Sequence, residues 1–262
     1  MKILMVGDVV GGPGRRVLKA RLAQIRRELG LAAVIVNAEN AAAGSGITVP
    51  LAREILDAGA DAITLGDHTW GQKDFAPTIG QLTNLVRPAN YPPDVPGKGW
   101  CLVTTALCRF AVVNLLGRVF MQPVDCPFRT MDALLREIPR DVPIFVDFHA
   151  EATSEKIALA RYLDGRVTAV VGTHTHVQTS DAFVFPGGTA FQSDLGMTGP
   201  WFSSIGRKFE PVLQKFTTGI PARFDVAEGP ATLEGAVITF DPATRKASAI
   251  EAFRYREPLA SS

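Results

Sequence analysis

The sequence contains little cysteine, no long apolar run and no excess of either charge. Its three cysteines, Cys101, Cys108 and Cys126, match no zinc-ligand spacing, and their odd number argues against a disulfide framework. No apolar stretch approaches the length of a transmembrane helix. The formal net charge is +1, which disfavours a general nucleic-acid-binding surface. We therefore expect buried thiols in a reducing compartment, the cytoplasm, and no membrane partner.

The overall composition is that of a globular protein. Hydrophobic residues make up 47% of the chain and charged residues 20%, which is typical of a protein with a substantial core. A length of 262 residues suits one large domain. We predict a single domain over residues 1–262.

The first part of the chain alternates apolar runs with amphipathic segments. Strands are predicted at 2–7, 32–37 and 60–65, and helices at 15–29 and 50–58. The glycine-rich stretch 11–14 lacks the lysine and spacing of a phosphate-binding loop and predicts a flexible lip. This alternation implies parallel strands whose carboxyl ends share one sheet edge, where ligand sites of open α/β sheets lie.

The rest of the chain is less regular. Prolines predict an irregular segment at 82–96. Strands are predicted at 101–106, 110–116, 143–148, 167–171, 233–240 and 247–253, helices at 130–138 and 152–163, and a hairpin at 182–185 and 189–191. Residues 199–230 show no clear pattern.

All four histidines follow strand-like apolar runs, and so do several oxygen-bearing side chains. An extended backbone at His174-Thr175-His176 would project both imidazoles to the same side. If the sheet is parallel as predicted, these polar side chains converge on one edge. The converging residues are Asp8, Glu39, Asn40, Asp67, His68, His149, His174 and His176.

A simpler interpretation is that Asp8 and Asp67 cap helices, Glu39 is a solvated loop residue, and the histidines lie in turns. Three converging carboxylates, however, would repel one another by about 4 kcal/mol per pair at 4 Å and an effective dielectric of 20. Cations would remove that repulsion. Oxygen and imidazole donors without thiolate favour manganese, iron, zinc or cobalt over a closed structural zinc, and magnesium alone would prefer fewer imidazoles. The residue types therefore predict a binuclear metallohydrolase.

The motifs also resemble a known superfamily, the calcineurin-like metallophosphoesterases. The resemblance rests on Gly7-Asp8, Glu39-Asn40, Gly66-Asp67-His68, an isolated His149 and Gly172-x-His174-x-His176. Further stretches at 87–92, 147–156, 172–179 and 193–199 resemble the YmdB-type branch, which contains 2′,3′-cyclic-nucleotide 2′-phosphodiesterases. Together these stretches span most of the chain.

This resemblance implies an α/β fold, a four-layer α/β/β/α sandwich of two mixed sheets. It implies that one metal is held by Asp8, Glu39, Asn40 and His176, and a second by Asp67, His149 and His174, with Glu39 bridging. The two ions would be divalent or of mixed valence, with iron or manganese as first candidates and zinc, cobalt or magnesium as alternatives.

The implied reaction is hydrolysis of a small cyclic nucleotide by a metal-bridging hydroxide. The substrate would be a 2′,3′-cyclic nucleotide, with 3′,5′-cyclic nucleotides as further candidates. His68 would protonate the departing oxygen; the simpler alternative for His68 is a structural hydrogen bond to the Asp8 side. We also expect a homo-oligomer, a dimer or a tetramer.

Two other functions remain open. One is a phosphomonoesterase or broad-specificity phosphoesterase, and the other is a metal-bound regulatory protein with incidental turnover.

The sequence departs from the superfamily pattern in two places. Val10 stands where most members carry a histidine, a feature that the YmdB-type branch shares. Asp67 stands where asparagine is usual, and its added negative charge predicts tighter metal retention and a weaker Lewis acid.

Other polar and aromatic residues are weaker candidates. Arg87 and Asn90 would contact substrate or stabilise a proline-rich turn, and Ser193-Asp194 would hydrogen-bond a ligating histidine or shape a turn. Trp70, close to His68 in sequence, would stack a nucleobase or belong to the core.

Overall fold

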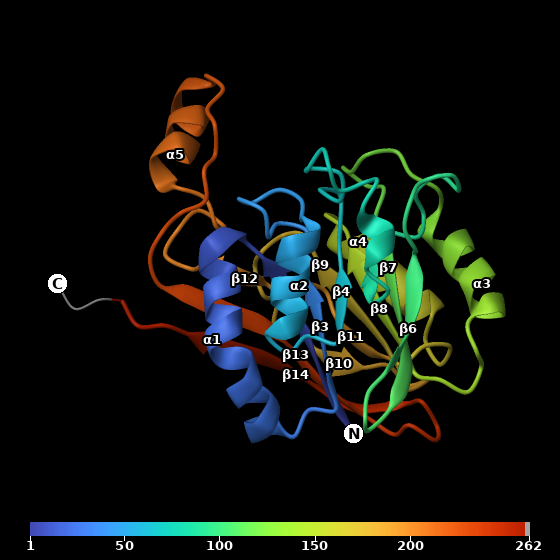
Figure 1. The fold of residues 1–262 in the computed structure, drawn as a ribbon. Helices are drawn as coiled ribbons and strands as arrows, with labels where there is room; N and C mark the ends of the chain where they lie inside the picture. Colours follow the sequence, from blue (N-terminus) through green and yellow to red (C-terminus); the bar gives the residue numbers. More distant parts are fainter. Residues whose placement is uncertain (260–262) are drawn as a thin grey trace.

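Two mixed β-sheets lie face to face at the centre of the structure, a computed structural model, and helices cover both outer faces (Figure 1). Helices α1 (Gly11–Leu29) and α2 (Val49–Asp57) cover the first sheet. Helices α3 (Pro127–Glu137) and α4 (Thr153–Tyr162) cover the second. This α/β/β/α order confirms the predicted fold class.

The structure describes residues 1–259, so the last three residues of the predicted domain, 260–262, lie outside the described residues. Within residues 1–259, no helix combines the length and the apolar character needed to cross a membrane.

The first sheet has the strand order β2-β12-β13-β1-β3-β4-β5, and β14 pairs with β13. Strands β1, β3, β4 and β5 run parallel, whereas β13 runs antiparallel to β1. The strands are β1 (Lys2–Val6), β2 (Asp8–Val9), β3 (Ala33–Asn37), β4 (Ala62–Thr64), β5 (Leu85–Val86), β12 (Met197–Pro200), β13 (Ala231–Phe240) and β14 (Ala247–Arg256).

The second sheet has the order β10-β11-β9-β8-β7-β6. Its four central strands, β7, β8, β9 and β11, are parallel, and the antiparallel β6 and β10 form the edges. The strands are β6 (Trp100–Thr104), β7 (Arg109–Leu116), β8 (Ile144–His149), β9 (Ala169–Thr173), β10 (Phe183–Val184) and β11 (Ala190–Gln192). The predicted strand pair at 101–116 and the predicted hairpin at 182–191 are confirmed.

Strand β1 explains why the buried strands have continuous apolar runs. Ile3 and Met5 point into the core between the sheets, whereas Leu4 and Val6 point into the core beneath the helices. Because both faces of a central parallel strand are covered, all four buried positions of β1, 3 to 6, are apolar rather than every second one.

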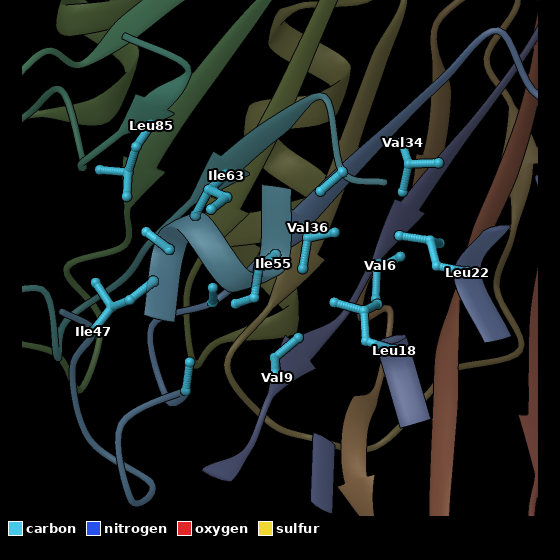
Figure 2. Packing of buried hydrophobic residues seen from close by; sticks show 14 of the residues in the cluster. Val6, Val9, Leu18, Leu22, Val34, Val36, Ile47, Ile55, Ile63 and Leu85 are labelled. Carbon is cyan, nitrogen blue, oxygen red and sulfur yellow. The ribbon is translucent and has the colours of Figure 1, made fainter. Parts of the chain in front are cut away.

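Figure 2 shows the core between the first sheet and its helices. Leu18 and Leu22 of α1 pack beside Val6, and Ile55 of α2 lies over Val36. Each of these side chains is essentially inaccessible to solvent. Full burial of one aliphatic side chain contributes about 1.5–3 kcal/mol, so this layer holds the strands, and the loops at their ends, in fixed positions.

The prediction of a flexible lip at residues 11–14 is wrong, because α1 begins at Gly11. A Cβ atom on Gly14 would lie 2.2 Å from the carbonyl oxygen of Thr198 in β12. Glycine therefore lets the first turn of α1 pack closely against a strand, and the segment is ordered.

Three further elements, β5, η1 and α5, lie where none was predicted. Strand β5 pairs with β4 inside the segment 82–96, where only irregular structure was expected, and a short 3₁₀ helix, η1 (Ile79–Gln81), precedes it. Helix α5 (Phe209–Thr218) projects from the sandwich at the end of an excursion that follows β12 (Figure 1). Only Val212 of α5 is buried, whereas Phe216 is 81% exposed.

Candidate metal centre

The predicted site residues lie at the carboxyl ends of strands from both sheets. Because the strands in each sheet are parallel there, their carboxyl ends face the same way. From the first sheet, Asp8 follows β1, Glu39 and Asn40 follow β3, and Asp67 and His68 follow β4; from the second, His149 ends β8, and His174 and His176 follow β9.

Four of these residues form the centre of the site. Glu39, Asp67, His149 and His174 each place one potential ligand atom within 4.8 Å of all the others. The Nε2 atom of His149 lies 3.3 Å from Oε2 of Glu39 and 3.0 Å from Oδ1 of Asp67. The Nδ1 atom of His174 lies 3.1 Å from the same Nε2. Glu39 and His149 are fully buried.

Asp8, Asn40 and His176 join this group directly. Asp8 Oδ1 lies 3.7 Å from Nδ1 of His149, and Asp8 Oδ2 accepts the backbone N–H of His174 at 3.1 Å. Asn40 Nδ2 lies 2.7 Å from Oε1 of Glu39 and 3.2 Å from Nε2 of His176. All seven predicted metal ligands therefore belong to one connected cluster.

Two buried oxygens in the cluster indicate that a cation fits here. Asp8 Oδ1 and Asn40 Oδ1 have no hydrogen-bond partner among residues 1–259. An unsatisfied buried polar atom costs about 1–3 kcal/mol, so such atoms are rare without a functional reason. Carboxylate, amide and imidazole donors suit a divalent transition metal. The residues thus fit the predicted ions, because their donor types are suitable and two of their oxygens lack, within the described chain, a hydrogen-bond partner that a cation could replace.

The structure excludes the helix-cap interpretation. Val10 is the N-cap residue of α1, and Thr78 is the N-cap residue of η1, the next helix after Asp67, so neither Asp8 nor Asp67 caps the helix that follows it. Glu39 is 1% exposed and is not a solvated loop residue.

The backbone at His174-Thr175-His176 is not extended, so that prediction is wrong. Strand β9 ends at Thr173, and φ is +103° at His174 and +63° at His176. A non-glycine residue in this region stores about 1–3 kcal/mol of strain and persists only where its surroundings enforce it. The turn directs the two rings to different partners: His174 faces His149, and His176 faces Asn40.

Hydrogen bonds orient two of the imidazoles. Nδ1–H of His149 donates to Oγ1 of Thr173 at 2.9 Å, and that hydroxyl donates to Oδ1 of Asp147 at 2.7 Å. Nδ1–H of His176 donates to the carbonyl oxygen of Ile205 at 2.9 Å. Both arrangements leave Nε2 facing the cluster, as a ligating histidine requires.

Sequence reasoning did not identify Asp147 as a supporting residue. It is 1% exposed and also accepts hydrogen bonds from Asn37 and Thr64, so it sits beneath the cluster rather than in it. The available signal was its position two residues before His149 on one strand, which places both side chains on the same face.

Burial and neighbouring charged or hydrogen-bonding groups shift the pKa values of the cluster's carboxylates in opposite directions. Burial raises the pKa of Asp8 to about 7. Burial acts in the same direction on Glu39, but the charge of His149 and hydrogen bonds from His149 and His68 lower the pKa of Glu39 to about 2. Although burial opposes it, hydrogen bonds from His149 and His174 hold the pKa of Asp67 well below its usual range. Metal ions would compete with protons for these groups.

His68 lies at the rim of the cluster, with 40% of its side chain exposed. Its Nδ1 lies 3.0 Å from Oε1 of Glu39, and its backbone N–H donates to Oε2 of the same carboxylate at 3.0 Å. The alternative of a hydrogen bond to the Asp8 side is therefore wrong. The contact with Glu39 raises the pKa of His68.

Two glycines allow the cluster to close. A Cβ atom on Gly66 would lie 2.2 Å from Oε2 of Glu39 and 2.5 Å from Nε2 of His149. A Cβ atom on Gly172 would lie 1.9 Å from the carbonyl oxygen of Ser193. The motifs contained these glycines, but their packing role becomes visible only in the fold.

The weaker candidates have structural contacts. Arg87 donates to three carbonyl oxygens, those of Pro88, Val95 and Pro96. Asn90 donates to the carbonyl oxygens of Leu116 and Asp125. Trp70 packs against the rings of Phe75 and Tyr91. These contacts support the structural alternatives.

Comparison with known proteins agrees with this description. Residues 4–253 match the family model described as YmdB-like protein. The chain is 49% identical over 252 residues to a Bacillus subtilis (strain 168) protein named 2′,3′-cyclic-nucleotide 2′-phosphodiesterase, with 96% of each chain covered.

Two crystal structures show the same fold over nearly the whole chain. One, described as a novel phosphatase from Mycoplasma pneumoniae, has a TM-score of 0.93 and 36% identity, covering 99% of this chain and 95% of that one. The other, a hypothetical protein from Thermus thermophilus, has a TM-score of 0.92 and 43% identity, covering 98% of this chain and 100% of that one. From the family match and these likenesses, the chain belongs to the YmdB-like family.

Proposed function

We propose that the protein is a metal-dependent phosphodiesterase that hydrolyses 2′,3′-cyclic nucleotides, with 3′,5′-cyclic nucleotides as further candidate substrates. The observation that carries this proposal is the cluster of seven ligand-type side chains with two unsatisfied buried oxygens, on Asp8 and Asn40. The name of the Bacillus subtilis relative supports the substrate class.

Under this proposal, Asp8, Asn40 and His176 hold one ion, Asp67, His149 and His174 hold the other, and Glu39 is shared. Iron or manganese are the proposed metals. Two such ions polarise phosphoryl oxygens and supply hydroxide near neutral pH.

His68 is proposed to protonate the leaving ribose oxygen when the phosphorus–oxygen bond breaks. Two contacts with Glu39 fix its backbone and its Nδ1, while the exposed part of the ring faces solvent, from which substrate arrives. The hydrogen bond with Glu39 raises the pKa of His68, a shift that favours the protonated imidazole that a general acid requires.

The test compares His68→Ala on two substrates that differ in their need for a proton. Loss of a general acid lowers turnover by about 10²–10⁴-fold when an alkoxide leaves. It should lower turnover of bis(p-nitrophenyl) phosphate far less, since p-nitrophenolate leaves without protonation. Metal content must stay at the wild-type value. Equal losses on both substrates would contradict the acid role.

A direct assay separates the alternatives. We expect wild-type protein to convert 2′,3′-cyclic nucleotides faster than p-nitrophenyl phosphate, a simple monoester. The reverse order would favour a phosphomonoesterase. A regulatory protein with incidental turnover would gain support if His68→Ala abolished turnover but left the cellular role intact. The cytoplasmic location and the homo-oligomer stay predictions, and light scattering would check the latter.

A further inference from the structure

We propose that a buried ion pair outside the ligand cluster, Lys156 with Asp194, is a positioning device that pre-forms the turn carrying His174 and His176. The proposal rests on the metal centre proposed above. It assigns a role to two residues that are not themselves ligands and that touch neither substrate nor metal.

The pair is fully enclosed. Lys156, on α4, is 2% exposed, and Asp194, two residues after β11, is 1% exposed. Nζ of Lys156 donates to Oδ2 of Asp194 at 2.9 Å. A lysine is almost never buried to this extent without a partner, so each charge depends on the other.

Asp194 holds the histidine turn through the backbone. Its Oδ2 also accepts the N–H of Thr175 at 3.1 Å, and Thr175 separates the two histidines. The neighbouring N–H, that of His174, donates to Oδ2 of Asp8. Successive backbone N–H groups in such a turn form an anion-binding concavity, here closed by two carboxylates.

The same aspartate fixes the far side of the turn. Asp194 Oδ1 accepts the N–H of Gly196 at 2.9 Å, and its backbone N–H and carbonyl oxygen bind Thr179. Asp194 thus ties the turn to the segment beside it, which explains how two positive φ angles are maintained at His174 and His176.

Lys156 makes this arrangement compatible with the cluster. Its ammonium group neutralises Asp194, so the turn gains a strong acceptor without adding net charge beside three carboxylates. Lys156 also packs along Gly172, where an added Cβ atom would lie 2.8 Å from its Cδ. The pair therefore fixes the conformation of the histidine turn without changing the net charge near the cluster.

The double variant Lys156→Met/Asp194→Asn tests this idea because it keeps the net charge of the pair at zero. The asparagine oxygen can accept from Thr175 or from Gly196 but, unlike a carboxylate, its amide cannot serve both N–H groups. Loss of a partner that orients metal ligands typically weakens metal affinity by about 10–100-fold. We expect a loss of this size for Mn²⁺, measured by competition with a chromophoric chelator.

The matched control is Glu155→Gln, at a neighbouring buried position of α4. Glu155 accepts the N–H groups of Arg118 and Val119 and does not contact the histidine turn. We expect a similar change in thermal unfolding but Mn²⁺ affinity within twofold of wild type. Lys156→Arg, which keeps the ion pair, should also retain affinity.

The outcomes are separable. If wild-type protein binds no Mn²⁺, the proposed function fails. If wild type binds and the double variant binds within twofold of it, only the positioning role fails. Should the double variant not fold, hydrogen exchange at the Thr175 amide of metal-free wild type decides: slow exchange supports a pre-formed turn, and unprotected exchange overturns it.

Discussion

Replacing Gly66 by alanine should disrupt the metal centre with little change to the rest of the fold. The added Cβ atom would lie 2.2 Å from Oε2 of Glu39 and 2.5 Å from Nε2 of His149, whereas ordinary contact begins at 3.4 Å. Glu39 and His149 must therefore each move away from the added Cβ atom by about 1 Å, and a misplacement of about 1 Å near reacting groups costs about 100-fold in rate. We expect at least that loss in turnover, together with weaker metal binding.

Gly80→Ala is the matched control. Gly80 lies in η1, has no positive φ, and has no atom within 4 Å of an added Cβ. Turnover of a 2′,3′-cyclic nucleotide, metal content and thermal unfolding would be measured for both variants. Wild-type turnover and metal content in Gly66→Ala would refute the reasoning, because the cluster would then tolerate a larger separation than its contacts imply.

Three further predictions concern charge, metal content and a thiol. Asp67→Asn removes one negative charge from the cluster. We expect a loss of metal affinity of about tenfold or more, and higher turnover at saturating metal. Unchanged metal affinity and unchanged turnover would contradict the charge argument. Elemental analysis of protein purified without chelator should give about two metal ions per chain, and chelation should lower the melting temperature; near-zero metal with no activation by added Mn or Fe would exclude the centre. Burial raises the pKa of Cys101 to about 11, so little thiolate exists at pH 8 and this thiol should react with Ellman's reagent much more slowly than the half-buried Cys108 and Cys126, the rate rising as the pH approaches 11. Three equally fast thiols would contradict that burial.

The α/β alternation and the convergence of the polar side chains could be predicted because both depend on local patterns, whereas the four-layer sandwich followed from the family resemblance. Apolar runs marked the central strands, and the polar residue after each run marked the carboxyl edge. His149 shows this well: six buried residues form β8, and the histidine is the last of them. Parallel packing then brings such ends together whatever their separation along the chain.

Features that depend on long-range packing could not be predicted. The left-handed backbone at His174 and His176 accompanies tertiary hydrogen bonds, from the N–H of His174 to Asp8, 166 positions away, and from the N–H of Thr175 to Asp194. The sequence around Gly14 predicts flexibility. In the structure, however, Gly14 packs closely against strand β12, which lies nearly two hundred positions later in the chain. Helix α5 buries only Val212 and leaves Phe209, Leu213 and Phe216 exposed, so packing against the core accounts for little of its position.

The two sheets contribute different elements to the centre. The proposed oxygen ligands come from the first sheet, through Asp8, Glu39, Asn40 and Asp67, and the proposed nitrogen ligands come from the second, through His149, His174 and His176. Neither sheet alone offers the mixed donor set that manganese or iron prefers. Bound metal would link the two sheets directly. A displacement of one sheet relative to the other would therefore change the coordination of both ions. Under the proposed ligand assignment, a chain whose two sheets packed out of register would not bring both kinds of donor together and would bind metal poorly.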